Sequence, residues 1–164
     1  MKRLVFVLMA ALAIPATVAA AHKDDAETTA PAFRLPTRSA AVNSDSLRGR
    51  VVVVDFWASW CAPCQRSFPW MNSLVTKYGA RGLTIVAINL DKQRELADEF
   101  LWRQPPHFVV AFDPAGTSAE AFHVDAMPTT FLISRDGHVL SRHAGYDPRK
   151  AASFESQIEE ALGP

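Results

Sequence analysis

The chain has 164 residues and the mixed apolar and charged composition of a globular domain. Seventeen Lys and Arg side chains balance seventeen Asp and Glu side chains, so the formal net charge at neutral pH is zero. This balance leaves no basic field that would attract nucleic acid, and we expect no nucleic-acid partner. The length is sufficient for one domain with its own hydrophobic core, which does not depend on disulfide bonds for stability.

The first residues are organised like a secretory signal peptide. A short basic start is followed by an apolar segment over residues 4–14 and then by small residues. We therefore expect residues 1–21 to be a cleaved signal peptide, residues 22–32 to be a flexible tether, and residues 33–164 to form a periplasmic domain. The alternative is an uncleaved membrane anchor, because residues 4–21 are long enough to span a bilayer.

The rest of the chain alternates strand-like and helix-like patterns. In chain order, these patterns predict a short edge strand at 33–35, a helical turn at 44–49, a buried strand at 51–57, a helix at 64–78, a buried strand at 83–90, a helix at 95–102, a strand at 108–112, a short helix at 118–124, a hairpin of strands at 129–134 and 138–144, and a closing helix at 148–162. This order predicts an α/β fold, in which helices cover both faces of a central mixed β-sheet.

The two cysteines of the chain, Cys61 and Cys64, directly follow the strand predicted at 51–57. As a structural disulfide they would close a loop too short to constrain the unfolded chain. A structural zinc site needs four ligands, and the sequence has no second pair of closely spaced cysteines or histidines. Covalent haem attachment requires a histidine directly after the second cysteine, where Gln65 stands. Thiol–disulfide exchange is the favoured interpretation.

The position of Cys61 supports exchange chemistry. Its sulfur would lie where the strand passes into a helix, next to unpaired backbone N–H groups and the positive end of the helix dipole. Both stabilise a thiolate, which is the form that attacks disulfides. Cys64, one helical turn later, is placed to resolve the mixed disulfide and should be shielded. The pair therefore predicts a redox-active disulfide in which Cys61 is the attacking thiol.

Asp55 is the third candidate catalytic residue. It stands between Val54 and Phe56 in a run that should be buried, and a buried, unpaired carboxylate is costly. An aspartate near a strand more often belongs to a turn or a helix cap, but the surrounding run favours a functional role. Burial should raise the pKa of this carboxyl, which would allow it to take the Cys64 proton.

The stretch from Val51 to Cys64, together with Met127-Pro128-Thr129, resembles the thioredoxin superfamily. The export signal and an insertion resemble its TlpA/ResA branch, which comprises periplasmic or membrane-tethered thiol–disulfide oxidoreductases. This resemblance covers approximately residues 32–162 and implies a thioredoxin fold. It also implies one extra α–β insertion before the cis-proline, for which residues 95–112 are the natural candidate.

The resemblance also implies roles for individual residues. Asp55 matches the buried acid that handles the proton of the second cysteine, and Trp60 matches the tryptophan beside the first cysteine. Pro128 matches the cis-proline that faces the disulfide, so the expected substrate-binding residues are Trp60, Met127, Pro128 and Thr129. Backbone near Met127 and Thr129 is expected to pair with an extended substrate strand.

Two features depart from the family pattern. Relatives in the TlpA/ResA branch commonly carry a glutamate three residues after the second cysteine, where this chain has Ser67. The acid is therefore expected on the strand, at Asp55. The lysine that often accompanies this aspartate in thioredoxins has no clear equivalent in residues 85–90.

The family resemblance implies an exported, monomeric enzyme that reduces protein disulfides, with cytochrome c maturation as one setting and a DsbD-like membrane protein as electron donor. The redox centre is the protein itself, so no cofactor or metal is expected. Two other functions stay open. A Sco-like copper chaperone would need a histidine such as His107 or His123, and its cysteines are separated by three residues instead of two. A peroxiredoxin needs a threonine or serine three residues before its attacking cysteine, where Ala58 stands.

Overall fold

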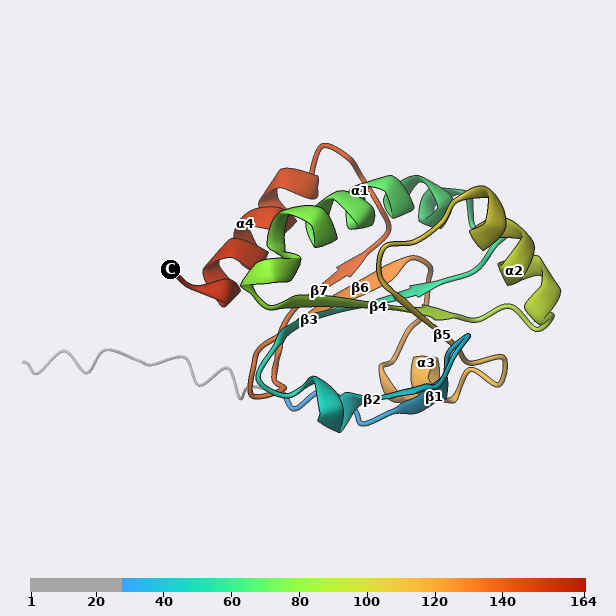
Figure 1. The fold of residues 1–164 in the computed structure, drawn as a ribbon, viewed down its shortest axis with the longest axis horizontal. Coiled ribbons are helices and arrows are strands. Elements are labelled where there is room, and N and C mark those ends of the chain that lie inside the picture. The colour runs from blue at the N-terminus through green and yellow to red at the C-terminus, as the bar shows by residue number, and fades with distance from the viewer. Residues whose placement is uncertain (1–27) are drawn as a thin grey trace, which may run out of the picture.

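The computed structural model describes residues 28–164 (Figure 1). The signal peptide predicted at 1–21 and residues 22–27 of the predicted tether lie outside the described residues. Within the described part of the chain, no helix is both long enough and apolar enough to cross a membrane.

The centre of the molecule is a five-stranded mixed sheet with the strand order β5-β4-β3-β6-β7. Three strands run parallel to one another: β3 (Val51–Trp57), β4 (Leu83–Asn89) and β5 (Val109–Phe112). The hairpin of β6 (Thr129–Ile133) and β7 (Val139–Ala144) is antiparallel, and β6 pairs with β3. The mixed sheet and its hairpin confirm the prediction.

Three helices cover one face of this sheet: α1 (Ala62–Tyr78), α2 (Arg94–Arg103) and α4 (Ala151–Leu162) (Figure 1). A single 3₁₀ turn, Gly79–Arg81, connects α1 to β4. The closing helix was predicted to begin at Pro148 but begins three residues later, at Ala151. Pro148 belongs instead to a turn, in which its carbonyl accepts a 3.4 Å hydrogen bond from the Ala151 N–H.

The opposite face is covered by a two-stranded sheet and a short helix (Figure 1). The strand predicted at 33–35 is β1 (Arg34–Pro36), which pairs with β2 (Ala41–Asn43). The helix is α3 (Thr117–Ala121), and the 3₁₀ turn Ser44–Leu47 follows β2. Strand β2 was not predicted, because three residues are too few to establish an alternating pattern.

Strand β3 is buried along its whole length because its alternate side chains enter two different cores. Val52, Val54 and Phe56 belong to the core beneath β1, β2 and α3. Val53 and Trp57 belong to the core beneath the three larger helices. Asp55 has the same parity as Val53 and Trp57, so its carboxyl enters the core on the helix face.

Between β4 and the β6–β7 hairpin, the chain forms α2, β5 and α3. This interval contains the additional α–β unit that the family resemblance implied. Strand β5 adds to the parallel side of the sheet, and α2 covers that side. The extra unit therefore widens the sheet without disturbing the central pair β3 and β6, which carries the candidate site.

The C-terminal end of α1 is fixed to α4. Lys77 forms an ion pair with Glu155. The buried Tyr78 hydroxyl lies 2.6 Å from a carboxylate oxygen of Glu155 and 2.6 Å from one of Glu159. Burial and these hydrogen bonds raise the pKa of Tyr78 to about 12, so the hydroxyl stays protonated and can donate.

Candidate active site

The two cysteines lie at the start of α1, where they form a disulfide with a Cα–Cα distance of 5.3 Å. Cys61 is the N-cap residue of the helix, and its Sγ accepts a hydrogen bond of 3.3 Å from the Cys64 N–H. Pro63 lies in the first turn, where a missing N–H leaves no helical bond unmade. The backbone donor and the helix dipole together favour negative charge on the Cys61 sulfur.

The two sulfurs differ in their surroundings. Cys64 is completely buried, whereas Cys61 keeps 5% of its surface exposed. Trp60, the residue before Cys61, is 68% exposed and is among the most exposed apolar side chains of the described residues. A partner can therefore approach the pair only from the side of Trp60 and Cys61.

The loop before β6 contains the expected cis-proline: the Met127–Pro128 bond is cis. The Thr129 hydroxyl donates to the Ala126 carbonyl at 2.7 Å and thereby closes this loop. Thr129 already lies in the sheet, in register with both of its neighbouring strands. Met127 is partly buried against the core that contains the cysteines, and its backbone forms no hydrogen bond with another described residue.

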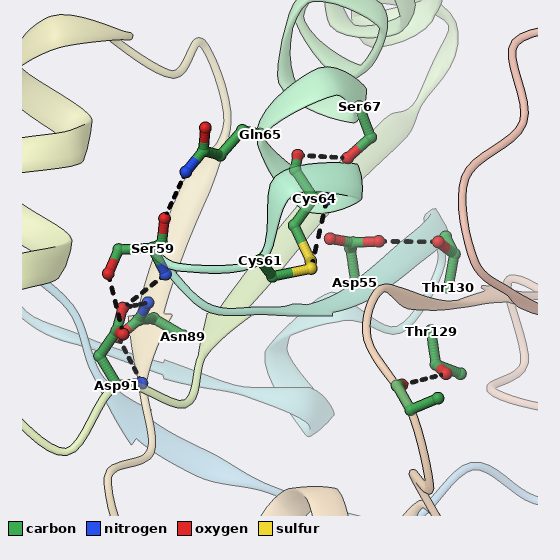
Figure 2. Close-up of a disulfide and its surroundings, with 11 residues drawn as sticks. Asp55, Ser59, Cys61, Cys64, Gln65, Ser67, Asn89, Asp91, Thr129 and Thr130 are labelled. Atoms are coloured by element: carbon green, nitrogen blue, oxygen red, sulfur yellow. Dashed lines mark hydrogen bonds between the residues drawn. A yellow bond between two sulfur atoms is a disulfide. The ribbon is translucent and has the colours of Figure 1, made fainter.

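Asp55 lies behind the cysteine pair. Its side chain is buried, with the residue 1% exposed, and its Oδ1 accepts a 2.7 Å hydrogen bond from the Thr130 hydroxyl. Its Oδ2 is buried and accepts no hydrogen bond from any described residue. Figure 2 shows the carboxylate between the cysteines and Thr130. The expected burial of Asp55 is confirmed.

Burial raises the pKa of Asp55 to about 7, although the hydrogen bond from Thr130 acts in the opposite direction. A carboxyl with this pKa can accept or release a proton near neutral pH. The partner of Asp55 is the hydroxyl of Thr130, 75 positions away in the chain.

A cluster of hydrogen-bonded polar residues, separate from Asp55 and Thr130, holds the loop between β3 and α1 in place. The Ser59 N–H donates to Asp91 Oδ2 at 2.8 Å, and the Ser59 hydroxyl donates to Asp91 Oδ1 at 3.0 Å. Asn89 donates to Asp91 at 2.7 Å, and Gln65 of α1 donates to the Ser59 carbonyl at 2.6 Å (Figure 2). These bonds hold the segment that presents Trp60 and Cys61.

These contacts between Ser59, Asn89 and Asp91 were not predicted from the sequence. The signal was present, because Asn89 and Asp91 lie at the end of the strand predicted at 83–90, beside the strand predicted at 51–57. The carboxyl ends of neighbouring parallel strands meet at one edge of a sheet, which brings Asp91 beneath Ser59.

The remaining aromatic residues are divided between core and surface. Trp57 is buried and packs against Phe68 and Phe100, with ring centroids 4.7 and 5.2 Å apart, so its predicted core position is confirmed. Trp102 of α2 is 81% exposed. Trp70 is half-buried, and its ring lies 5.6 Å from that of Phe154.

The described residues offer no additional ligands for a metal. Among residues 28–164, no three His, Cys, Asp or Glu side chains gather in a way that could hold a metal ion. His107 and His123, the histidines considered for a copper site, are exposed. Ala58, three residues before Cys61, is buried and has no hydroxyl.

Comparison with known proteins gives consistent results. The model of the redoxin family matches residues 25–162. The thiol-disulfide oxidoreductase ResA of Bacillus thuringiensis subsp. konkukian is 33% identical over 115 residues, which are 70% of this chain and 63% of that protein. The chain therefore spans less than two thirds of that relative.

Solved structures extend the match over nearly whole chains. A Chlorobium tepidum protein assigned as the thiol:disulfide interchange protein DsbE has 47% identity and a TM-score of 0.82, over 84% of this chain and 97% of that one. A thioredoxin family protein from Chlorobium tepidum TLS has 30% identity and a TM-score of 0.72, over 85% and 99%. The fold, the cysteine pair and these matches agree: the chain belongs to the redoxin family, as a TlpA/ResA-like member of the thioredoxin superfamily.

Proposed function

We propose that this protein is an exported thiol–disulfide oxidoreductase that reduces disulfides in other proteins. The observation that carries the proposal is the cysteine pair at the start of α1. Cys61 keeps 5% of its surface exposed, and its sulfur accepts a hydrogen bond from the Cys64 N–H at a helix N-terminus, while Cys64 is completely buried. Named relatives with this activity support the assignment.

The reaction balances within the protein and its substrate. The Cys61 thiolate attacks one sulfur of the substrate disulfide, which breaks the S–S bond and releases the other sulfur as a thiolate. Cys64 then loses its proton and attacks the sulfur of Cys61. This second step forms the Cys61–Cys64 disulfide and releases the second substrate thiolate. Two electrons pass from the protein to the substrate.

Asp55 accepts the Cys64 proton during the second step. Its burial behind the cysteine pair and its pKa of about 7 support this role, because a base is most effective when its pKa is near the working pH. Ser67, which stands where relatives have a glutamate, donates its hydroxyl to the Cys64 carbonyl at 2.8 Å and is no base at neutral pH.

The substrate is an extended protein segment that binds across Trp60 and the Met127–Pro128 loop. Within residues 28–164 the Met127 backbone forms no hydrogen bond, which supports pairing with a substrate strand there, as in other complexes formed by strand addition. The exposed ring of Trp60 supplies apolar contact beside the attacking sulfur. Thr129 closes the loop from inside the sheet, and Pro128 is buried at its turn.

The proposed setting is the periplasm, with residues 1–21 acting as an export signal. A DsbD-like membrane protein would return electrons to the Cys61–Cys64 disulfide, and cytochrome c maturation is the proposed pathway. The similarity to a protein assigned as DsbE supports an interchange role. The protein would act as a monomer, without a cofactor.

Alkylation and trapping test the proposal. We expect the reduced protein to react with iodoacetamide first at Cys61, with a thiol pKa below the free-cysteine value of about 8.5. A Cys64→Ser variant should accumulate mixed disulfides through Cys61, whereas Cys61→Ser should accumulate none. Faster alkylation of Cys64, or equal trapping by both variants, would contradict the assignment.

A further inference from the structure

A row of three polar side chains crosses the sheet behind the cysteine pair. Asp55 of β3 is in register with Thr130 of β6, which is in register with His143 of β7. Side chains directly opposite each other on antiparallel strands point to the same face of a sheet. The row therefore lies on the face covered by α1 and α4. The His143 ring contacts Phe154 of α4, with centroids 4.7 Å apart.

A cavity of about 380 Å³ lies at the end of this row. The buried residues Thr130 and Phe154 form part of its wall, as do the exposed residues Gly145 and Lys150. The lining thus extends from the interior of the sheet to the protein surface. A cavity of this size has room for several water molecules, so water can reach the part of the wall that Thr130 forms.

The carboxyl of Asp55 has no direct access to solvent. The residue is 1% exposed, and its neighbours on the same face of β3, Val53 and Trp57, are completely buried. Among the described residues, only Thr130 forms a hydrogen bond with its carboxyl group. A proton that reaches Asp55 from Cys64 must still leave the interior before the next catalytic cycle.

We propose that Thr130 is a positioning residue whose hydroxyl passes the proton from Asp55 to water in this cavity. This inference rests on the proposed function, because it concerns the proton released when Cys64 attacks. A hydroxyl can accept one hydrogen bond while it donates another. Protonated Asp55 donates to Thr130 Oγ1 while the Thr130 hydroxyl gives its own proton to water. The carboxyl proton then takes its place, so one proton leaves Asp55 and one enters the cavity.

Several titratable and charged groups surround the path from Asp55 to the cavity. Cys61 and Cys64 face Asp55 from α1, as Figure 2 shows. Titratable and charged groups line the cavity: Arg142, His143, Tyr146, Asp147 and Lys150. Of these, Asp147 is paired with Arg149 at 2.8 Å and Arg142 with Asp125 at 3.5 Å. His143 Nε2 lies 3.1 Å from Gln157 Oε1. None of these cavity-lining groups forms a hydrogen bond with the carboxyl of Asp55 within residues 28–164, so Thr130 remains its link to water.

The test uses the reduced protein and an aromatic disulfide, 5,5′-dithiobis(2-nitrobenzoate), in a stopped-flow instrument. Each coloured thiolate reports one step, because attack by Cys61 releases the first and resolution by Cys64 releases the second. These thiolates stay ionised at neutral pH, so the Cys64 proton must appear in solvent, where an indicator dye detects it. The variants are Thr130→Val, which keeps the shape but lacks the hydroxyl, and Thr130→Ser, which retains it.

We expect Thr130→Val to leave the first step unchanged and to make proton release lag behind resolution. Resolution itself should slow about tenfold near neutral pH, because without the hydrogen bond from Thr130 more of Asp55 is already protonated and cannot act as a base. Its pH profile should shift to higher pH, because the hydrogen bond that lowers the Asp55 pKa is lost. Thr130→Ser should restore the rate and the prompt proton signal. Thr84→Val, which removes a hydroxyl bonded to Arg50 elsewhere in the sheet, is the matched control and should behave as wild type.

The experiment distinguishes failure of the proposed function from failure of the proton relay through Thr130. A wild-type protein that does not reduce the disulfide would overturn the proposed function and the relay with it. Normal attack with wild-type resolution and prompt proton release in Thr130→Val would overturn the relay alone. A serine variant as slow as the valine variant would also overturn it. If the valine variant does not fold, Thr130→Ala provides a second side chain without a hydroxyl.

Discussion

Asp55 and Asp113 are both buried aspartates of the central sheet, but their surroundings are opposite. Asp55 lies in the middle of β3, and its side chain accepts one hydrogen bond from the described residues, that from Thr130. Asp113 directly follows β5 and accepts bonds from the N–H groups of Gly116, Thr117 and Ser118 and from the two hydroxyls there. Both residues expose very little surface, 1% for Asp55 and 3% for Asp113.

The balance between burial and hydrogen bonding determines the direction of each pKa shift. Burial raises the pKa of both carboxyls, but at Asp113 the bonds from Ser118 and its neighbours outweigh burial and hold the pKa below its usual value. At Asp55 burial prevails, and the pKa rises to about 7. A saturated carboxylate stabilises the loop around it, whereas an under-bonded one can exchange a proton.

The largest expected effect concerns stability and pH. The pKa of Asp55 is about 7 in the folded protein against an ordinary value of 3.8. Between these values the folded state binds more protons than the unfolded state, so the stabilisation is complete below the lower pKa and is lost as the pH rises through the upper one. Asp55→Asn should remove this dependence. Relative to the variant, the oxidised wild type should lose roughly 4 kcal/mol between pH 4 and pH 8, at about 1.4 kcal/mol per pKa unit. Urea unfolding at both pH values measures it, and parallel curves for the two proteins would contradict it.

The second-largest expected effect is on the rate at which Cys64 resolves the mixed disulfide. Asp55→Asn should slow resolution by Cys64 about a hundredfold at neutral pH, which is the lower range for loss of a general base. The effect should diminish at alkaline pH, where Cys64 ionises without help, and attack by Cys61 should be unchanged. Asp113→Asn is the matched control, with both steps at wild-type rates. Slower attack in Asp55→Asn would indicate that the residue maintains the structure of the site.

The smallest effect is the stability cost at Asp113. Asp113→Asn replaces an acceptor oxygen with an amide group that faces donors, and it should lower the free energy of unfolding by about 2 kcal/mol at neutral pH. Because the folded pKa of Asp113 is depressed, this stabilisation is present above the unfolded pKa and is lost as the pH falls through the folded pKa. The cost should therefore shrink in acid, opposite in sign to the Asp55 effect. A cost that does not vary with pH would refute the contrast.

Local patterns in the sequence were sufficient for most of the fold. The buried run of β3, the helical spacing in α1 and the turn of the β6–β7 hairpin each identify an element without knowledge of the rest. Strand β2 was missed because its three residues are defined by pairing with β1, which depends on tertiary contact. The start of α4 was misplaced because a proline turn precedes the helix.

The site was predictable where the chemistry is local and not where it depends on distant partners. Cys61 and Cys64 were evident from their spacing, and Asp55 from a charge within an apolar run. Thr130 was not, because its contact with Asp55 joins residues 75 positions apart. The bonds from Ser59 to Asp91 span 32 positions and were missed for the same reason.

The attachment of α1 to α4 has a consequence for mobility. Lys77 and Tyr78 hold the last turn of α1 against Glu155 and Glu159, while the cysteines occupy its first turn. Sliding of α1 along its axis when the disulfide opens would break these contacts. The bond that reduction breaks lies in the first turn, at the other end of the helix. We therefore expect the two redox states to share the same outline, so that a partner distinguishes them through the surface immediately around Cys61.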